Sequence, residues 1–340
     1  MKLRYYIIRR LILAVVVLFG VTIIAFVLTR LVPANPVHMW VGPRATPEQI
    51  VAAEKELGLN QPILIQYFGY MGDLLQGNLG TSIRTHNPVL EDITHFLPAS
   101  LEIILLGMFI AVVLGVPLGL YSAAKRNTWV DHAARLFSVT GVSLPTFWLA
   151  MILQLIFFQQ LGLLPSSGRI SLQIQQAYPF ESITGFILID TLLQGNLIAF
   201  QDAAKHIILP ALTMAAYPLG LVTRQVRSAT IDVLNEDYIR MERAFGIKES
   251  KILFVYTLRN SFGSTLNVLA LTFAYSLVSI FLIESIFSWP GLGTYAATSI
   301  SVMDYPAIMG IVILVAVIYV FLNLAVDVIQ AYMDPRIRFD

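Results

Sequence analysis

The segment between residues 237 and 246 has the residue types and spacing of a surface that binds another molecule. Three apolar side chains recur at helical spacing, namely Tyr238, Met241 and Phe245. Three charged side chains form a neighbouring row, namely Asp237, Arg240 and Arg243. Gly246 then supplies a helix stop. A short amphipathic helix of this kind binds either an anionic lipid surface or a groove on a protein, and its mixture of charges favours the protein groove.

Residue patterns for nucleotide or metal chemistry are missing from the sequence. No glycine-rich phosphate loop ending in Lys and Ser or Thr occurs, no histidine pair flanks a glutamate at metalloprotease spacing, and there is no cysteine. The histidines are scattered, and we expect them to be solvated: His38, His86, His95, His132 and His206. We therefore expect a chain that is not an enzyme, with no catalytic residue, no metal site and no cofactor of its own.

Groups that could couple transport to an ion are also missing from the centres of the apolar runs. Ion-coupled carriers hold ionisable side chains inside their membrane spans. Here Glu102, Glu284 and Asp327 fall at the ends of such runs, where we expect solvated or snorkelling carboxylates. A carrier or channel, or a membrane enzyme, is thus supported only by hydrophobicity. If the chain transports a solute, its energy must come from another polypeptide.

The elements that position these residues are membrane-spanning helices. Hydrophobic residues make up 57% of the 340 residues and charged residues only 13%, which is typical of a polytopic membrane protein. The net charge of +1 gives no indication of nucleic-acid binding. A bilayer core needs about 20 apolar residues in a helix. Six stretches meet this requirement, approximately Leu11–Thr29, Leu101–Ala124, Leu136–Leu161, Ile207–Val222, Phe262–Ile283 and Ile308–Val326.

The distribution of positive charge predicts the orientation of these spans. Sixteen of the 22 Lys and Arg fall at the two termini, at residues 125–135 and at residues 224–259. Both termini should therefore be cytoplasmic, and the first run should be an anchor helix rather than a cleaved signal peptide. Long external segments follow the first and third spans. In the first of them, Thr46, Pro47 and Gln49 indicate a short helix that closes near Gly58.

Proline and glycine recur within the spans, at Gly115, Pro117, Gly119, Pro145, Pro210 and Pro218. These residues allow close approach of helices or kinks, and broken helices beside a transport pathway use them too. We favour the packing interpretation.

The segment around residue 240 resembles the coupling-helix motif of ABC import permeases of the dipeptide and oligopeptide family. The residues that match are Asp237, Tyr238, Ile239, Arg240, Arg243, Ala244, Gly246, Leu258, Arg259 and Asn260. Further similarity occurs at Ile286–Gly293, at Gly185–Asp190 and at Asp334, Pro335 and Arg336, in the order found in the B-type permease. Glu242 replaces the alanine usual in the motif and Phe245 replaces a basic residue, so the identity of the partner is open.

This resemblance implies a type I ABC importer permease fold, all-α, with six transmembrane helices. A cytoplasmic coupling segment, about residues 228–260, would lie between helices 4 and 5. Residues 1–98 would form the N-terminal end, first span and external loop, and residues 99–340 the permease core. The residues expected to contact the ATPase are Asp237, Tyr238, Arg240, Met241, Glu242, Arg243, Ala244 and Gly246.

The resemblance also implies the partners and the location. The partners are a C-type permease, two cytoplasmic ATP-binding subunits that hold ATP and Mg²⁺, and an extracytoplasmic solute-binding protein. The location is the cell (inner) membrane of a bacterium or archaeon. Short peptides are the favoured substrate, with oligosaccharides, nickel complexes or other small solutes as alternatives.

The turn after the fifth span has two interpretations. It is either an external gate that contacts the binding protein, or a rigid turn built by proline and glycine. Its candidate residues are Glu284, Trp289, Pro290, Gly291 and Gly293.

Overall fold

The computed structural model describes residues 3–31, 36–42, 44–56 and 58–333, and the similarity at Asp334–Arg336 lies outside them. Five of its helices are long and apolar enough to cross a bilayer. They are α1 (Leu3–Leu31), α5 (Val89–Ala124), α10 (Leu197–Leu234), α13 (Leu258–Ser279) and α16 (Tyr305–Met333). The expected membrane helices therefore form, and several of them extend beyond the apolar runs that predict them.

The expected span at Leu136–Leu161 is not one straight helix. It consists of α6 (Trp129–Ser143), α7 (Thr146–Leu153) and the π-helix η1 (Gln154–Gln160), with a bend of 104° between Ser143 and Thr146. Pro145 causes this break, because it lacks a backbone N–H and disfavours helical backbone at the residue before it. Leu144 is accordingly extended, with φ −71° and ψ 128°. The prediction of six spans holds if this bent pair is counted as one.

Short helices occupy the segments between the spans. They are α2 (Pro36–Val41), α3 (Pro47–Glu56), α4 (Ile63–Leu75), α8 (Leu172–Ala177), α9 (Ile187–Leu193), α11 (Asp237–Ala244), α12 (Glu249–Lys251), η2 (Ile252–Thr257), α14 (Phe281–Ile286) and α15 (Leu292–Ser301). The helix expected after Thr46 is α3. Its capping box forms, because the backbone N of Thr46 donates to Gln49 Oε1 at 2.9 Å and the backbone N of Gln49 donates to Thr46 Oγ1 at 3.4 Å.

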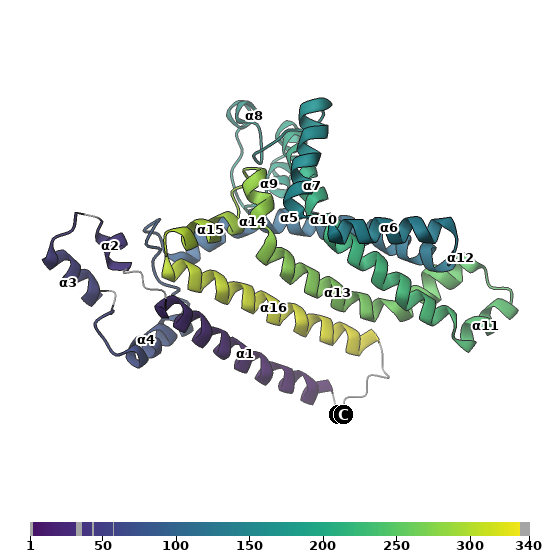
Figure 1. Ribbon diagram of the computed structural model, residues 1–340, viewed down its shortest axis with the longest axis horizontal. Coiled ribbons are helices and arrows are strands. Elements are labelled where there is room, and N and C mark those ends of the chain that lie inside the picture. The colour runs from purple at the N-terminus through teal and green to yellow at the C-terminus, as the bar shows by residue number, and fades with distance from the viewer. Residues whose placement is uncertain (1–2, 32–35, 43, 57, 334–340) are drawn as a thin grey trace.

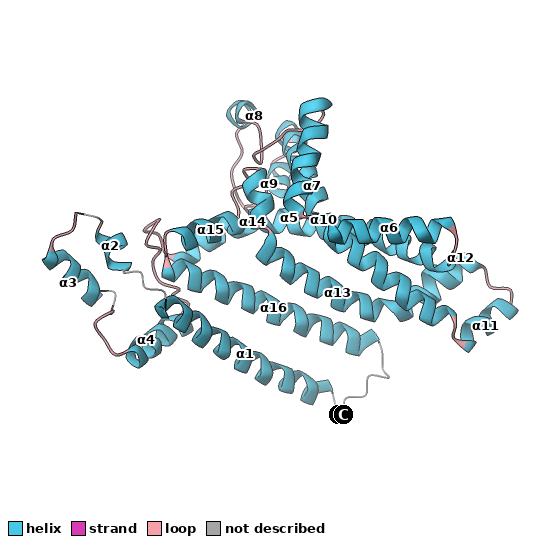
Figure 2. Ribbon diagram, viewed as in Figure 1, coloured by secondary structure: helices cyan, strands magenta, loops and turns pink. Residues whose placement is uncertain are grey.

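Most of the long helices lie roughly along the long axis of the molecule, while α7, α8 and α9 project from one side of it (Figure 1). The described chain is helix and loop throughout (Figure 2). Helices α1, α16 and α13 follow one another across the molecule, and α5, α6 and the second half of α10 lie beyond α13. Helices α2 and α3 lie at one end of the long axis and α11 lies at the other. The segment expected to face the cytoplasm is thus well separated from the first external segment.

Glycines in α5 allow α10 to approach closely. A Cβ atom on Gly119 would lie 2.7 Å from Val226 Cβ and 2.8 Å from the carbonyl oxygen of Thr223. Gly107 and Gly115 face α10 in the same way. This contact supports the packing interpretation of the glycines.

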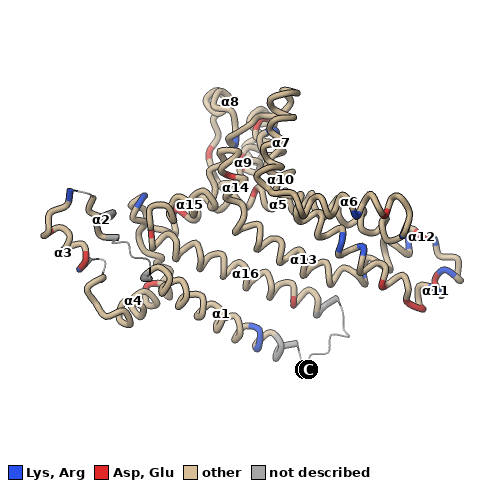
Figure 3. Tube along the Cα trace, viewed as in Figure 1, with Lys and Arg blue, Asp and Glu red and all other residues tan. Residues whose placement is uncertain are grey.

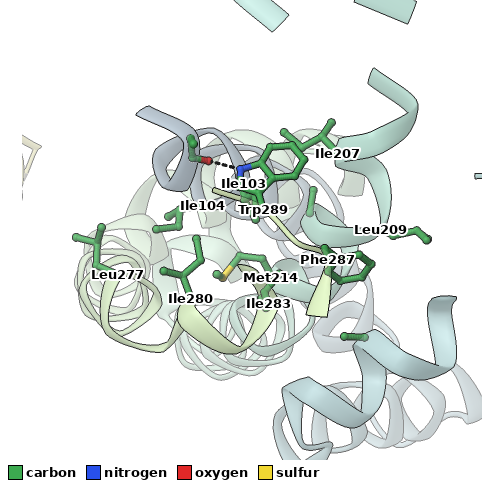
Figure 4. Packing of buried hydrophobic residues seen from close by; sticks show 13 residues of the cluster. Ile103, Ile104, Ile207, Leu209, Met214, Leu277, Ile280, Ile283, Phe287 and Trp289 are labelled. Carbon is green, nitrogen blue, oxygen red and sulfur yellow. Dashed lines mark hydrogen bonds between the residues drawn. The ribbon is translucent and has the colours of Figure 1, made fainter. Parts of the chain in front are cut away.

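Buried apolar residues from five helices form the main core (Figure 4). Ile103 and Ile104 of α5 meet Ile207 and Met214 of α10, and residues of α7, α13 and α14 complete the cluster. Trp289 is inserted among them, and its indole Nε1 donates to the carbonyl oxygen of Ala99 at 2.9 Å. The core therefore joins the middle of the bundle to the turn after the fifth span.

Charged residues lie mainly near the helix ends, and long stretches of α1, α13 and α16 hold none (Figure 3). Two expected surface carboxylates are nevertheless buried, since Glu102 is 6% exposed and Glu284 is 0% exposed. The expectation of solvated side chains was wrong for both, because polar partners from distant segments surround them. Asp327 lies near the end of α16 and pairs with Arg10 of α1, with an Nε–Oδ2 distance of 3.0 Å.

One histidine also differs from expectation. His206 lies inside α10 and is buried, and its Nδ1 is 2.8 Å from the carbonyl oxygen of Asp202. His206 was expected in a solvated loop because the apolar run that predicted this span begins only at Ile207. Helix α10 begins earlier, at Leu197, and so includes His206. His86, His95 and His132 are exposed as expected, and the side chain of His38 lies outside the described residues.

Candidate coupling surface and external turn

The segment expected to couple to a partner is the helix α11. Asp237 lies in its first turn, where a carboxylate is favourable at the positive end of the helix dipole. Gly246 has φ +77°, and its backbone N donates to the carbonyl oxygen of Arg243 at 2.9 Å. The backbone N of Ile247 donates to the carbonyl oxygen of Glu242 at 3.2 Å. These two bonds form a Schellman motif, which confirms the predicted helix stop.

One face of α11 presents apolar side chains to the outside. Ile239 is fully buried and anchors the helix. On another face Tyr238, Met241 and Phe245 are 36%, 56% and 77% exposed. We call these three side chains the coupling face. Helix α11 lies at one end of the long axis (Figure 1), and the exposed side chains of its coupling face leave room for a partner outside the bundle.

Two arginines of α11 form exposed ion pairs close to the helix, one with Asp237 of the same helix and one with Glu249 of α12. Arg240 Nη1 is 3.3 Å from Asp237 Oδ1, and Arg243 Nε is 2.6 Å from Glu249 Oε1. Such exposed pairs contribute little to stability, about 0–1 kcal/mol. Glu242, which departs from the motif, has a buried Oε2 atom without a hydrogen-bond partner in the described chain. Ala244 is exposed.

The coupling face is connected to two spans. Helix α11 follows α10 and precedes α12, η2 and α13, which run on as one helix. Asn260 of α13 donates from Nδ2 to the hydroxyl of Tyr238 at 2.8 Å. Ile252 in η2 is fully buried. The coupling face is thus joined to α10 by chain continuity and to α13 by a side-chain hydrogen bond.

A buried ion pair holds the ends of three helices together. Asp131 in α6 is fully buried and accepts from Arg227 of α10, at 2.6 Å from Nε and 2.9 Å from Nη2. It also accepts from Ser122 Oγ of α5 at 2.7 Å and from the backbone N of Asn127 at 3.0 Å. Sequence reasoning missed this site, whose only local signal is an acidic residue in the first turn of α6.

Replacing Arg227 by alanine should strongly destabilise the bundle. The substitution removes both hydrogen bonds from the guanidinium and leaves the buried Asp131 carboxylate with only the partly exposed Arg135, whose Nε is 3.6 Å from Oδ1. Breaking a buried ion pair costs about 3–5 kcal/mol of the free energy of unfolding. Thermal unfolding of the purified protein in detergent measures this effect. Arg224→Ala is the matched control, because Arg224 is exposed on the same helix and forms no ion pair with the described residues. Equal unfolding temperatures for the two variants would contradict the role of the pair.

The turn after the fifth span, which we call the external turn after its expected side, contains Glu284, Trp289, Pro290, Gly291 and Gly293, of which only Pro290 is exposed. Helix α15 begins after Gly291, which has no side chain to cap it. Glu284 supplies the cap instead, since its Oε2 accepts from the backbone N of Thr294 at 2.6 Å. Its Oε1 accepts a short hydrogen bond from Ser100 Oγ, which in turn accepts from the backbone N of Leu292 at 2.7 Å. The turn is therefore fastened to both α5 and α15.

Burial raises the pKa of Glu284 above its ordinary value, while the hydrogen bonds from Ser100 and Thr294 lower it in part. A raised pKa means that the protonated form of the acid is favoured in the folded chain. The contribution of protonated Glu284 to the free energy of unfolding is therefore fully present at a pH below its ordinary pKa. It is lost as the pH rises through the raised pKa that Glu284 has in the folded chain.

The two glycines of the turn are required by space. A Cβ atom on Gly293 would lie 2.7 Å from the backbone N of Phe281. One on Gly291 would lie 2.5 Å from Ser100 Oγ. Nothing larger than a hydrogen atom fits at either position. The turn is therefore tightly packed, and its role as a gate is a prediction.

A second buried ion pair lies behind the external turn. Arg169 Nη2 is 2.8 Å from Glu102 Oε2 and also donates to the carbonyl oxygen of Gly185 at 2.8 Å. The backbone N of Leu188 donates to Glu102 Oε1 at 2.9 Å. The guanidinium carbon of Arg169 lies 5.6 Å from the centre of the Trp289 ring. Sequence reasoning took Glu102 for a solvated carboxylate at the end of an apolar run, whereas it is a buried partner of Arg169.

Among the described residues, no group of three or more His, Asp and Glu could hold a metal ion.

Comparison with known proteins identifies the family. Residues 115–339 match the family model described as the binding-protein-dependent transport system inner membrane component. Residues 3–104 match the model of the N-terminal part of such membrane components. In a search of solved structures, an inward-facing form of the MetNI methionine ABC transporter has a TM-score of 0.48 and 14% identity, covering 69% of this chain and 93% of that one.

Curated relatives cover nearly the whole chain. The probable D,D-dipeptide transport system permease protein DdpB of Escherichia coli strain K12 is 42% identical, over 95% of this chain and 94% of the relative. The di/tripeptide transport system permease protein DppB of Pseudomonas aeruginosa is 40% identical over 98% of each chain. The glutathione transport system permease protein GsiC of Salmonella choleraesuis is 33% identical over 98% of this chain and 99% of the relative. The chain thus belongs to the family of inner membrane components of binding-protein-dependent transport systems, as its coupling-helix motif indicated.

Proposed function

We propose that this chain is the permease subunit that conducts di- or oligopeptides through the membrane in an ATP-driven, binding-protein-dependent importer. The observation that carries this proposal is its similarity along nearly its full length to permeases named for dipeptide and di/tripeptide transport. The relative named for glutathione transport adds a third short peptide. Oligosaccharides, nickel complexes and other small solutes are the alternative substrates.

The energy for transport comes from partner subunits in this proposal. Two cytoplasmic ATP-binding subunits hold ATP and Mg²⁺, a C-type permease forms the other half of the pathway, and a solute-binding protein delivers the peptide. The exposed coupling face supports a docking role for α11, and its connection to α10 and α13 supports transmission of the ATPase movement to the pathway. Whether this chain alone can transport is open to direct measurement.

The proposed orientation places both termini and α11 in the cytoplasm. The excess of Lys and Arg at residues 224–259 supports it, as does the position of α11 at the end of the molecule opposite α2 and α3. The external turn then lies on the extracytoplasmic side, where we propose that it closes the outer end of the pathway. The separate family matches at residues 3–104 and 115–339 support a division into residues 1–98 and 99–340.

Reconstitution of the complete system in proteoliposomes tests the substrate and the energy source. Labelled dipeptide should accumulate only when ATP, the ATP-binding subunits and the solute-binding protein are all present. Omission of ATP should reduce accumulation to the background of empty liposomes. Uptake by this chain alone with an ion gradient would overturn the proposal. Transport of an oligosaccharide or a nickel complex without transport of any peptide would overturn its substrate.

A further inference from the structure

Helix α4 (Ile63–Leu75) is strongly apolar, yet none of its residues is buried. Asp73 is its only charged residue. A helix of 13 residues is marginal in water by itself, because most of the stability of a short helix comes from the packing of its apolar face. An apolar environment outside the described chain must therefore cover α4.

The exposed apolar side chains of α4 form one face. Leu64, Phe68 and Leu75 recur at helical spacing and are 67%, 70% and 82% exposed. We call these three side chains the α4 face. Asp73 is also exposed, and it lies on the opposite side of the helix because successive residues are about 100° apart. The helix is therefore amphipathic, with an apolar side and a polar side that both face outward.

Aromatic side chains attach α4 to the membrane-spanning helix α1. The hydroxyl of Tyr67 is 2.9 Å from Thr22 Oγ1, and its ring meets that of Phe26 edge-on with 5.3 Å between the centroids. The ring of Tyr70 stacks on Phe26, with 6.0 Å between the centroids. Thr22 and Phe26 both lie within the span Ile7–Thr29. The tyrosine side of α4 is thus held against a span, and α4 lies beside the outer part of α1 (Figure 1).

The ends of two spans indicate the depth of α4. Thr29 is the last residue of the first span, and Tyr305 is the first residue of the last span. Both of them line one cavity together with Gln66 and Tyr70 of α4. Helix α4 therefore lies at the level where these two spans leave the hydrocarbon core. Tyrosine is enriched at this boundary of membrane proteins, as Tyr70 and Tyr305 are here.

The surroundings of α4 at this level are apolar. Helix α1 packs against α16 and lies at the edge of the bundle (Figure 1). Only 17% of its most apolar stretch is buried, and Ile24 and Leu28 are 60% and 58% exposed. The α4 face therefore continues an exposed apolar surface that a membrane span already presents to lipid. No lysine or arginine lies between Lys55 and Arg84, so burial of apolar area must hold α4 there rather than attraction to anionic headgroups.

We propose that α4 is an interfacial helix whose α4 face is buried among lipid chains at the membrane boundary, beside α1. In the proposed orientation this boundary belongs to the outer leaflet. The inference uses the membrane placement of the spans and does not depend on the transported substrate. It anchors in the bilayer a part of the first segment that was expected to be external.

Spin labels on single cysteines test this position, and the chain itself has no cysteine to interfere. Phe68→Cys and Asp73→Cys are each labelled with a nitroxide and reconstituted in nanodiscs with cysteine-free partner subunits. Oxygen concentrates in lipid, whereas a nickel chelate stays in water. The ratio of collisions with oxygen to collisions with the chelate should be several-fold higher at Phe68 than at Asp73. Ile24→Cys on α1 is the lipid reference and should resemble Phe68→Cys.

The same measurement distinguishes lipid from a protein that covers α4. Burial of the α4 face under another subunit would lower both collision rates at Phe68. Contact with the solute-binding protein would lower the rate with the chelate only after that protein is added. Either result would rule out the interfacial position, as would equal ratios at Phe68 and Asp73.

Leu75→Cys repeats the test at the most exposed position of the α4 face and should give the same ratio as Phe68→Cys. Thermal unfolding of each labelled variant controls for folding, and it should match that of wild type because all the labelled side chains are exposed. A ratio at Leu75 that resembled the one at Asp73 would show that the α4 face is in water.

Discussion

Replacing Gly291 by alanine should remove most of the folded protein from the membrane. The added Cβ atom would lie 2.5 Å from both Glu284 Cδ and Ser100 Oγ, so the carboxylate and the hydroxyl must both move. Neither has room, since Glu284 and Ser100 are each 0% exposed. Displacement would break the hydrogen bond to Ser100 and the cap on Thr294, and would leave a buried carboxyl without partners. We expect overpacking and the lost hydrogen bonds together to lower the free energy of unfolding by roughly 3–5 kcal/mol.

The yield of folded protein after detergent extraction and its thermal unfolding measure this effect. Gly263→Ala is the control, because a Cβ atom there meets nothing within 4 Å and the residue lies inside α13. That substitution should be neutral or slightly stabilising, since alanine favours helix more than glycine does. If Gly291→Ala unfolded at the same temperature as Gly263→Ala, the packed arrangement of the external turn would be wrong.

The membrane helices were predictable because long apolar runs in a chain have few other uses. The first and last residues of these helices were harder to predict. Helix α5 begins at Val89 and α10 at Leu197, before the runs at Leu101 and Ile207 that predict them. Hydropathy indicates where a helix meets lipid, whereas the helix itself continues into polar surroundings as long as its backbone is satisfied. The break at Pro145 was not predicted, because the apolar run from Leu136 to Leu161 is continuous in the sequence and we favoured packing as the role of its proline.

The local features of the site were predictable, and its long-range contacts were not. The spacing around Gly246 specifies a helix and its stop, because capping depends on neighbouring residues. Glu284 could not be placed, since its partner Ser100 is 184 residues away. Arg227 and Asp131 are likewise separated by 96 residues. A single sequence shows a carboxylate at the end of an apolar run, and only the fold shows whether water or a buried donor surrounds it.

Charging the coupling face should abolish transport without unfolding the chain. Phe245 is 77% exposed, so Phe245→Asp changes little within this subunit. If α11 docks in a groove of the ATP-binding subunit, the substitution removes an aromatic anchor and places a charge at the interface. Loss of such an anchor costs about 2 kcal/mol or more, which corresponds to a roughly 30-fold loss of affinity. Substrate-stimulated ATP hydrolysis and peptide uptake should therefore both fall to near background.

Two related substitutions act on the backbone and on the charges of the same helix. Gly246→Asp puts a side chain on a residue with φ +77°, which costs about 1 kcal/mol and tilts the end of α11. Arg243→Glu places a second negative charge beside Glu249, where the native pair is 2.6 Å apart. Both should lower stimulated ATP hydrolysis while the chain still inserts into the membrane.

The matched control for Phe245→Asp is Leu172→Asp, which charges a side chain 65% exposed on α8, an element outside the coupling segment. It should retain stimulated ATP hydrolysis. The alternative is that α11 lies on the membrane surface. It would be shown by two results together: stimulated ATP hydrolysis is unchanged in Phe245→Asp and Gly246→Asp, and anionic vesicles protect α11 from reagents that reach it without lipid. The mixed charges of the segment argue against that outcome, because anionic lipid attracts its arginines and repels Asp237, Glu242 and Glu249 alike. A protein groove can offer a complementary group to each.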